Sequence, residues 1–464
     1  MLLVRYKVIS VFRAIYWFMV DRFSWWPINL FHFKRKNRLN VEKRIAYYLW
    51  RYPTLSETFI QREIAALKKS RLCVEVVADA PGNLEILDDD TRTSAKDTRY
   101  LFPINKKLLL EYIIYFLLKN LLSFPTLLLY VIFHKYHDHK TVKEDVIIFV
   151  KAVYLAGLLK DMRINHAHSP WAEVNAFILL IAAQLLRIPY TIEARAHDLH
   201  RETSSYALSE KLANAEFIVT NTIFNELHIK KWFLDKRDWE KLHTIYEGID
   251  LKQFEPNSDR QNYSRLTKIL SVARLIEPKG LVYLLRACKV LKKSGYLFRC
   301  EIIGGPEEPL YTSYYTMLKK LHMKLELDDS VFFLGAQPFN KVLEHYRNTD
   351  IFVLPCVVAA DGTRDITPNA LIEAMAMKLP VISTNMTGIP EVVEDGVSGI
   401  LIPPNDENAL AEAMIKLIEN HDLREKLGEN ARKKIEERFD INKNIVKYVA
   451  LFEDVGNVRI QKHG

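Results

Sequence analysis

Apolar and polar positions follow one recurring unit along the chain, a short apolar run followed by a turn and a longer segment with helical spacing. The short runs predict strands at 44–50, 74–78, 165–167, 190–192, 217–220, 268–272, 300–303, 331–334, 351–354, 381–383 and 400–402. The longer segments, such as 58–68 and 172–186, predict helices, the first opened by a Ser56 or Thr58 cap. Strands that alternate with helices are typical of a parallel sheet with helices on both faces. The pattern therefore predicts an α/β fold with two doubly wound, Rossmann-like domains.

A polar loop, GIDLKQFEPNSDRQNYS at 248–264, interrupts this alternation once. Loops of this composition usually link domains. We therefore expect an N-terminal domain at 41–255, a C-terminal domain at 256–440, and a helical segment at 441–464 that packs across the domain seam. Open α/β sheets bind ligands at the carboxyl ends of their strands, so the expected site is a cleft where the two domains face each other.

Length and composition agree with this organisation. The 464 residues are 49% hydrophobic and 26% charged, which is typical of a globular chain too long for one core. The four cysteines have no C-x-x-C spacing, so we expect neither a disulfide framework nor a metal site, and a reducing compartment. The acidic triplet at 88–90 follows no strand, and we interpret it as a solvated loop.

The net charge of +8 is concentrated at the N-terminus. Residues 1–44 contain ten basic and two acidic residues, so the rest of the chain is neutral overall, which argues against nucleic-acid binding. Residues 1–40 also contain ten aromatic residues. Mixed cations and aromatic rings suit an anionic membrane surface, so we expect peripheral attachment there. The alternative is an amphipathic helix packed on the body of the protein.

A second apolar region extends over 108–133, with Glu111 and Lys119 as its only charged residues. It contains no run of the roughly 18 uncharged apolar residues that a membrane-spanning helix needs. Two interpretations remain, a buried helical hairpin or a surface that rests on lipid.

The most informative stretch for chemistry is 352–406. A buried strand ends in a polar loop, and Pro368 is expected to begin a helix, because proline has no N–H group to leave unpaired in the first turn. The free N–H groups of such a helix start form an anion site that suits phosphate. The residues expected to provide it are Thr367, Asn369 and Ala370.

Asp365 and Glu373 lie eight residues apart, one before this helix and one on its second turn. Two carboxylates so placed can accept hydroxyl hydrogen bonds from sugars at either end of a diphosphate. The alternative is that Asp365 caps the helix and Glu373 is a surface acid.

Two cations follow the strand in LSVARLIEPKG, Arg274 and Lys279. At the carboxyl end of a strand they would stabilise the charge of a departing nucleoside diphosphate without a metal ion. As exposed salt-bridge partners they would contribute little. Gly304 and Gly305, after the next strand, would allow a close backbone approach to the nucleotide.

In the first domain, EARAHDLHR places Arg195 and His197 after a strand. Arg195 is a candidate substrate-binding residue, and His197 is a candidate for positioning the sugar or the incoming hydroxyl. His168, which also follows a strand, favours this interpretation, although a lone histidine is usually structural.

At these residues the chain resembles a known family. ARLIEPKG, EGIDLKQF and the stretch from Asp365 to Glu391 resemble the donor domain of retaining family 4 glycosyltransferases with the two-Rossmann GT-B architecture. YPTLSETFIQREI and ARAHDL resemble the first domain of the branch that acts in exopolysaccharide and colanic-acid-type synthesis.

The resemblance implies that Arg274 and Lys279 hold the donor diphosphate and that Glu373 binds the donor ribose. Asp365 occupies the position of the glutamate that contacts the donor sugar, and His197 matches the first-domain histidine. Aspartate is one methylene shorter than the family's glutamate. This departure affects the expected sugar preference more than the reaction class.

The expected function is that of a retaining, metal-independent hexosyltransferase that needs no cofactor. Its expected partners are a nucleoside-diphosphate sugar and a saccharide acceptor, expected to be lipid-linked, in cell-surface polysaccharide synthesis. The expected location is cytoplasmic, on the inner face of the cell membrane. The alternatives are a nucleotide-sugar epimerase or hydrolase of the same fold, and a non-catalytic membrane-bound assembly protein that binds nucleotide sugar.

Overall fold

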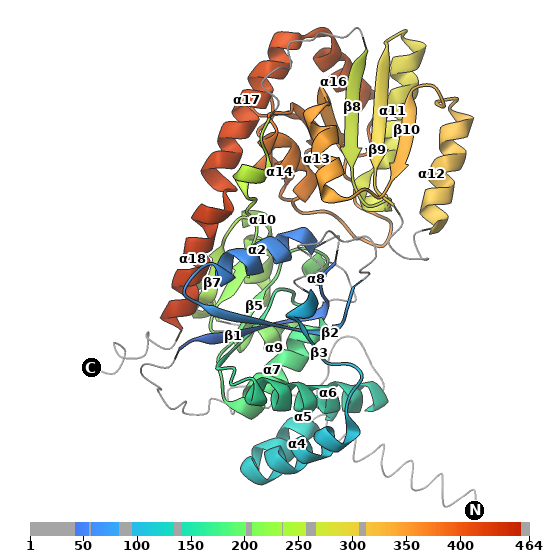
Figure 1. The fold of residues 1–464 in the computed structure, drawn as a ribbon. Coiled ribbons are helices and arrows are strands. Elements are labelled where there is room, and N and C mark those ends of the chain that lie inside the picture. Colours follow the sequence, from blue (N-terminus) through green and yellow to red (C-terminus); the bar gives the residue numbers. More distant parts are fainter. Residues whose placement is uncertain are drawn as a thin grey trace, which may run out of the picture.

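The computed structural model describes residues 42–54, 57–82, 95–133, 142–200, 207–233, 235–256, 266–305 and 312–455. The basic segment 1–40 and the acidic triplet 88–90 lie outside these ranges. The described residues form two parallel sheets, each with its own helices, one in each half of the chain (Figure 1). The predicted fold class, two doubly wound α/β domains, is confirmed.

The N-terminal domain contains a seven-stranded sheet of order β3-β2-β1-β4-β5-β6-β7, in which every neighbouring pair is parallel. Its strands are β1 (Arg44–Arg51), β2 (Cys73–Ala80), β3 (Arg99–Tyr100), β4 (His166–Ser169), β5 (Tyr190–Glu193), β6 (Ile218–Thr220) and β7 (Leu242–Thr244). The five strands predicted for this domain are present. Strands β3 and β7 were not predicted, because two or three residues are too few to show an apolar period.

The helices of this domain are α2 (Thr58–Lys68), α4 (Lys106–Lys119), α5 (Ser123–Phe133), α6 (Val142–Asp161), α7 (Val174–Leu186), α8 (His197–His200), α9 (Leu208–Ala213) and α10 (Ile223–Ile229). Almost every side chain of α7 is buried, which explains why its sequence has no polar face. The prediction that Ser56 or Thr58 caps the start of α2 is wrong. Glu57 occupies the cap position, and no side chain caps the helix there.

The C-terminal domain contains a six-stranded parallel sheet of order β10-β9-β8-β11-β12-β13. Its strands are β8 (Thr267–Val272), β9 (Phe298–Ile303), β10 (Val331–Gly335), β11 (Ile351–Leu354), β12 (Val381–Thr384) and β13 (Ile400–Ile402), all of which were predicted. Its helices are α11 (Leu281–Lys293), α12 (Thr312–Lys324), α13 (Phe339–Arg347), α14 (Asn369–Ala376), α15 (Ile389–Val392), α16 (Glu407–Glu419) and α17 (His421–Arg438). The order places β8 and β11 side by side at the sheet centre, so the segments that follow them are neighbours.

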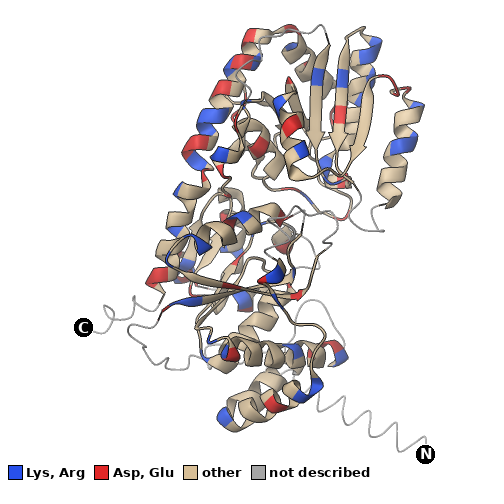
Figure 2. Ribbon diagram, in the orientation of Figure 1, with Lys and Arg blue, Asp and Glu red and all other residues tan. Residues whose placement is uncertain are grey.

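The chain crosses between the domains twice, once after β7 and once from α17 to α18 (Ile441–Asp454). The two crossings are hydrogen-bonded to each other, from Ile249 N–H to Phe439 O at 2.8 Å and from Ile441 N–H to Ile249 O at 3.0 Å. A Cβ atom on Gly248 would lie 2.5 Å from the Cα atom of Ile441, so this close approach requires glycine. Charged residues follow the outside of α17 (Figure 2), whereas Tyr448 on α18 packs into the core of the first domain.

The apolar region 108–133 forms α4 and α5 at the end of the N-terminal domain that is farthest from the C-terminal domain (Figure 1). Phe116 and Leu127 are buried in the domain core. Leu118, Leu121 and Leu122 are 67%, 66% and 86% exposed. One side of the hairpin is therefore core and the other side is an uncovered apolar surface. Among the described residues, no single helix is long and apolar enough to cross a membrane, and α4 and α5 pass that test only as a pair bent by 114°.

Candidate active site

Lys279 lies on a tight turn after β8. The turn is a 3₁₀ segment (Glu277–Lys279) that ends at Gly280, whose φ of +65° favours glycine. A Cβ atom on Gly280 would lie 1.8 Å from the carbonyl oxygen of Pro355, so the turn is packed against the segment that follows β11. Lys279 is 9% exposed, and Arg274, at the end of β8, is half-buried. Both predicted cations lie at the carboxyl edge of the sheet.

Asp365 is directly paired with Lys279. The Nζ atom of Lys279 lies 2.7 Å from Oδ2 of Asp365, with the two side chains 11% and 19% exposed. The Cys356 thiol donates a 3.5 Å hydrogen bond to the same oxygen. Burial, together with the charge of Asp365, raises the pKa of Cys356, so the thiol stays protonated and remains a donor. The structure thus brings a predicted phosphate-binding cation and a predicted sugar-binding carboxylate into one contact.

Helix α14 begins beside this pair. Its first residue is Asn369, one position later than predicted, with Pro368 at the cap position. No side chain caps the first turn, and the buried Oδ1 atom of Asn369 has no hydrogen-bond partner. The hydroxyl of Thr367 accepts a 3.1 Å bond from Asn221 of the other domain. An uncapped helix start with its partial positive charge is suited to an anion.

Glu373 lies on the second turn of α14 and is 8% exposed. Its Oε1 atom accepts a 2.6 Å bond from Arg62 of the N-terminal domain, and Oε2 accepts a 3.2 Å bond from the hydroxyl of Tyr346. It is therefore a buried carboxylate with one hydrogen-bond partner on each oxygen, rather than a surface acid.

Of the two predicted glycines, Gly304 is the one whose position requires glycine. Its φ is +143°, and a Cβ atom there would lie 1.8 Å from the carbonyl oxygen of Ala273. Its N–H donates a 2.9 Å bond to Gly335 at the end of β10. At Gly305 a Cβ atom would make only ordinary contact with Ala336, at 3.5 Å. Gly304 thus fixes a sharp turn at the same strand edge as Lys279.

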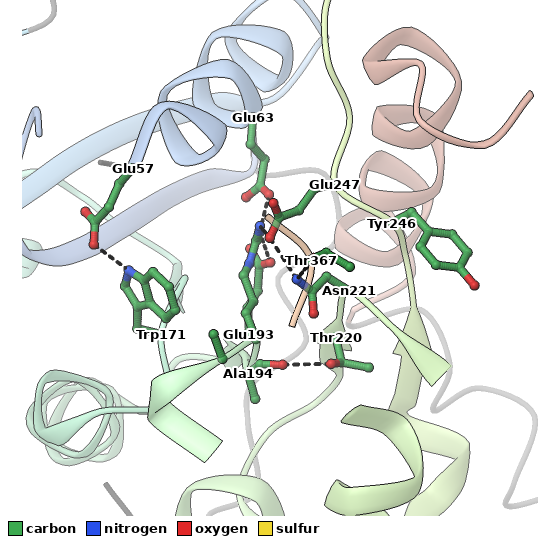
Figure 3. Close-up of polar contacts among 12 residues, drawn as sticks. Glu57, Glu63, Trp171, Glu193, Ala194, Thr220, Asn221, Tyr246, Glu247 and Thr367 are labelled. Atoms are coloured by element: carbon green, nitrogen blue, oxygen red, sulfur yellow. Dashed lines mark hydrogen bonds and ion pairs between the residues drawn. The ribbon is translucent and has the colours of Figure 1, made fainter. Parts of the chain in front are cut away.

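Arg195, predicted to bind substrate, is enclosed by protein. It is 2% exposed, and its guanidinium pairs with three glutamates, Glu63, Glu193 and Glu247. These three glutamates are labelled in Figure 3 and lie close together there. Its guanidinium carbon also lies 4.9 Å from the ring centre of Phe59. A guanidinium that three carboxylates already bind has little capacity left for a substrate. The prediction for Arg195 is therefore wrong, and Arg195 belongs to a buried ion-pair network of the N-terminal domain.

His168 belongs to the same buried network. Its two ring nitrogens lie 2.9 Å from Oγ1 of Thr191 and 3.0 Å from Oε1 of Glu193, and it is fully buried. Burial lowers the pKa of His168 to about 3, so the ring is neutral. The expected support from His168 for a histidine site is therefore absent, and His168 is structural.

His197 is the first residue of α8, and its side chain lies outside what the structure describes. The loop before it is held by Asp198, whose carboxylate accepts hydrogen bonds from the N–H groups of Arg195 and Ala196, at 3.2 and 2.6 Å, and from Ala172 N–H at 2.9 Å. Asp198 thus fixes the turn from which His197 begins, and the role of His197 stays a prediction.

Among the described residues, one group of three side chains has metal-ligand spacing, namely Glu63, His168 and Glu193. The guanidinium of Arg195 already pairs with both carboxylates. Burial raises the pKa of Glu63 to about 7, with a further rise from the charge of Glu193 and an opposing effect of Arg195. The Arg195 guanidinium thus occupies the position that a metal ion would take between the two carboxylates, so these residues do not fit a metal ion.

Several residues of the N-terminal domain that contact the C-terminal domain could not be identified from the sequence. Arg62 contacts Glu373, and Asn221 donates to both Thr367 and Glu247, which lie close to it in Figure 3. Glu391 is bound from the other domain as well, by the N–H groups of Ile223 and Phe224 and by the Tyr246 hydroxyl. Arg62 lies within the YPTLSETFIQREI motif, but no spacing in the sequence shows which residue of the other domain it meets.

The family comparison points to the C-terminal domain. Residues 255–434 match the model of the family described as glycosyl transferases group 1. The putative colanic acid biosynthesis glycosyltransferase WcaL of Escherichia coli K12 is 38% identical over 203 residues, which cover 43% of this chain and 48% of WcaL. The matched part of the chain thus spans about half of that relative. The amylovoran biosynthesis glycosyltransferase AmsK of Erwinia amylovora is 29% identical over 387 residues, 81% of this chain and 90% of AmsK.

Solved structures match the whole two-domain framework. A glycosyltransferase from Rickettsia africae ESF-5 superposes with a TM-score of 0.66 at 17% identity, covering 91% of this chain and 100% of that chain. Anabaena Alr3699/HepE in complex with UDP and glucose superposes with a TM-score of 0.63 at 16% identity, covering 87% and 99%. At these identities the likeness shows the fold. The C-terminal domain thus matches the glycosyl transferases group 1 model, and the two-domain framework is the fold of these solved glycosyltransferase structures.

Proposed function

We propose that the protein is a retaining, metal-independent hexosyltransferase. It moves a hexose from a nucleoside-diphosphate sugar to a hydroxyl of a saccharide acceptor in exopolysaccharide synthesis. The names of WcaL and AmsK, colanic acid and amylovoran biosynthesis glycosyltransferases, support the pathway class. The complex of HepE with UDP and glucose supports a nucleotide-sugar donor.

One observation carries this proposal, the convergence of the donor-type groups at one edge of the second sheet. Lys279 follows β8, Gly304 follows β9, and Asp365 with the uncapped start of α14 follows β11. Since β9, β8 and β11 are adjacent in the sheet, these segments meet at the same edge. Contacts to Arg62 and Asn221 show that the first domain faces this edge.

Each of these residues binds a different part of the nucleotide-sugar donor. The ammonium of Lys279 has three N–H donors, of which Asp365 takes one, so the others remain for the diphosphate. The pair also holds Asp365 near the sugar hydroxyls despite its short side chain. Glu373 accepts the hydroxyls of the ribose, and Arg274 and the start of α14 add positive potential along the diphosphate.

The reaction breaks the bond between the anomeric carbon and the diphosphate oxygen, and the electron pair stays with the diphosphate. Lys279, Arg274 and the first turn of α14 stabilise that charge, which replaces the need for a metal ion. The acceptor hydroxyl attacks the anomeric carbon from the same face, and its proton passes to the departing diphosphate oxygen. Closure of the two domains excludes water, which favours transfer over hydrolysis.

We further propose that the protein attaches peripherally to the inner face of the cell membrane, where a lipid-linked acceptor would lie. The basic and aromatic segment 1–40 supports this assignment. So does the outward face of α4 and the turn after it, where Leu118, Leu121 and Leu122 are exposed beside the cation Lys119. Leucines that enter the lipid surface, with lysines at the headgroups, are typical of interfacial helices.

Incubation of the full chain with radiolabelled nucleotide sugars and acceptor-containing membranes tests the reaction. Transfer predicts label in the lipid or polysaccharide fraction, at the anomeric configuration of the donor. Label released as free sugar would instead indicate an epimerase or hydrolase. Donor binding without any labelled product would indicate a non-catalytic assembly protein.

A further inference from the structure

An ion pair between the two domains ends on the carboxylate that we assign to the donor ribose. Arg62, on the second turn of α2, donates from Nη2 to Oε1 of Glu373 at 2.6 Å, with the two side chains 12% and 10% exposed. The guanidinium carbon lies 5.7 and 5.6 Å from the ring centres of Phe254 and Phe339. A cation of the first domain thus lies over two aromatic rings that pack edge to face, with their centres 5.8 Å apart.

The same contacts leave Glu373 with little capacity for another donor. Its second oxygen accepts from the Tyr346 hydroxyl at 3.2 Å. A carboxylate oxygen has two acceptor sites, but the Arg62 guanidinium that bonds to Oε1 is itself 12% exposed and lies over the rings of Phe254 and Phe339. A ribose hydroxyl that approaches Oε1 therefore meets Arg62 first.

The arginine is itself incompletely bonded in this position. Its Nη1 atom is buried and has no hydrogen-bond partner. A buried N–H group without an acceptor carries a desolvation cost, which is removed when the side chain leaves for water or for a phosphate oxygen. The ion pair therefore links the two domains, but its unbonded Nη1 atom favours replacement of this contact by another partner of Arg62.

We propose that Arg62 is a latch. Arg62 bonds to the Glu373 oxygen that we assign to the donor ribose, and the ribose hydroxyls displace it when the nucleotide binds. The inference rests on the proposed function, which assigns the ribose to Glu373. Only molecules in which Arg62 has left Glu373 can bind the ribose fully. The apparent affinity for the nucleotide is therefore the intrinsic affinity multiplied by the fraction of molecules in this open state.

Calorimetric titration of the full chain tests the latch. The probe is whichever of UDP, GDP, ADP and dTDP binds the wild-type protein most tightly, together with its 2′,3′-dideoxy counterpart. Arg62→Met removes the cation but keeps an apolar side chain against the two rings. Arg62→Lys keeps a cation with weaker geometry. Arg286→Met is the matched control, because Arg286 pairs with Glu407 on the surface of the C-terminal domain, at 3.5 Å.

Arg62→Met is expected to bind the nucleoside diphosphate about tenfold more tightly, as follows if the latch is closed in nine molecules of ten. Its preference for the ribose over the dideoxy form should grow by a similar factor, since the hydroxyls no longer compete with Arg62. Arg62→Lys should give an intermediate value, and Arg286→Met should equal the wild type. Thermal unfolding of each variant verifies that it is folded, and the lysine variant carries the test if the methionine variant is not.

Equal or weaker binding by the Arg62 variants, with an unchanged ribose preference, would overturn the latch and leave the donor site intact. If Glu373→Gln and Lys279→Ala also bind as the wild type does, the donor site is elsewhere. In that case the proposed function's site and the latch are both wrong, and the two failures are thereby distinguished.

Discussion

Replacing Lys279 with alanine removes the cation that the proposed donor site depends on. In the structure Lys279 Nζ lies 2.7 Å from Asp365, and both side chains are mostly shielded from water. Two unit charges about 4 Å apart attract by about 1 kcal/mol in water and about 4 kcal/mol at an effective dielectric constant near 20. The loss of attraction to the diphosphate should lie in that range, and the unpaired Asp365 charge then repels the diphosphate.

A loss of about 1 to 4 kcal/mol in the transition state corresponds to a fall of about 5-fold to 1000-fold in kcat/KM for the donor. The assay is initial-rate transfer from labelled donor at limiting concentration. Lys341→Ala is the matched control, because Lys341 forms an ion pair with Glu344 at 2.9 Å but is half-exposed on α13. An unchanged kcat/KM in Lys279→Ala, or an equal loss in the control, would refute the reasoning.

Three further predictions address the framework and the membrane surface. The pKa of Glu63 is about 7 in the folded protein, against an ordinary value of 4.5. Because the folded state therefore holds this proton more tightly than the unfolded state, the unfolding free energy should fall by roughly 3 kcal/mol as the pH rises from about 4.5 to 7. Denaturant titrations at several pH values should show a smaller fall of the unfolding free energy in Glu63→Gln than in the wild type. The same fall in both proteins would contradict the prediction. Gly304→Ala, whose Cβ would lie 1.8 Å from Ala273 O, should lower the unfolding free energy by about 1 to 3 kcal/mol, whereas an unaltered thermal midpoint would show that the turn tolerates a side chain. Leu118→Gln combined with Leu122→Gln should reduce sedimentation with anionic vesicles at least about tenfold, and full retention would remove the α4 surface from the membrane proposal.

Much of the architecture could be predicted from the sequence because it is encoded locally. Each strand of the second domain is an apolar run of its own, and Pro368 marks a helix start to within one residue. The cations after β8 could be found in the same way, because a residue that follows a strand is placed at the sheet edge by the strand itself. Asp365 and Lys279 meet at this edge for that reason.

The contacts between the domains could not be predicted in this way. Arg62 and Glu373 are 311 residues apart, and their meeting depends on how the two sheets are set against each other by the crossings at Gly248 and Ile441. Arg195 was misassigned for a related reason. Its position after a strand suggests the cleft, but three carboxylates from α2, β5 and the segment after β7 converge on it and bury it. Burial by distant segments leaves no local pattern in the sequence.

The structure of the protein with a bound nucleoside diphosphate, chosen by thermal-shift screening, tests the central claim most directly. We expect the diphosphate to contact Lys279 Nζ and the first turn of α14, and the ribose hydroxyls to lie on Glu373. A nucleotide bound elsewhere, with Lys279 still paired only to Asp365 and Glu373 still held by Arg62, would contradict the account.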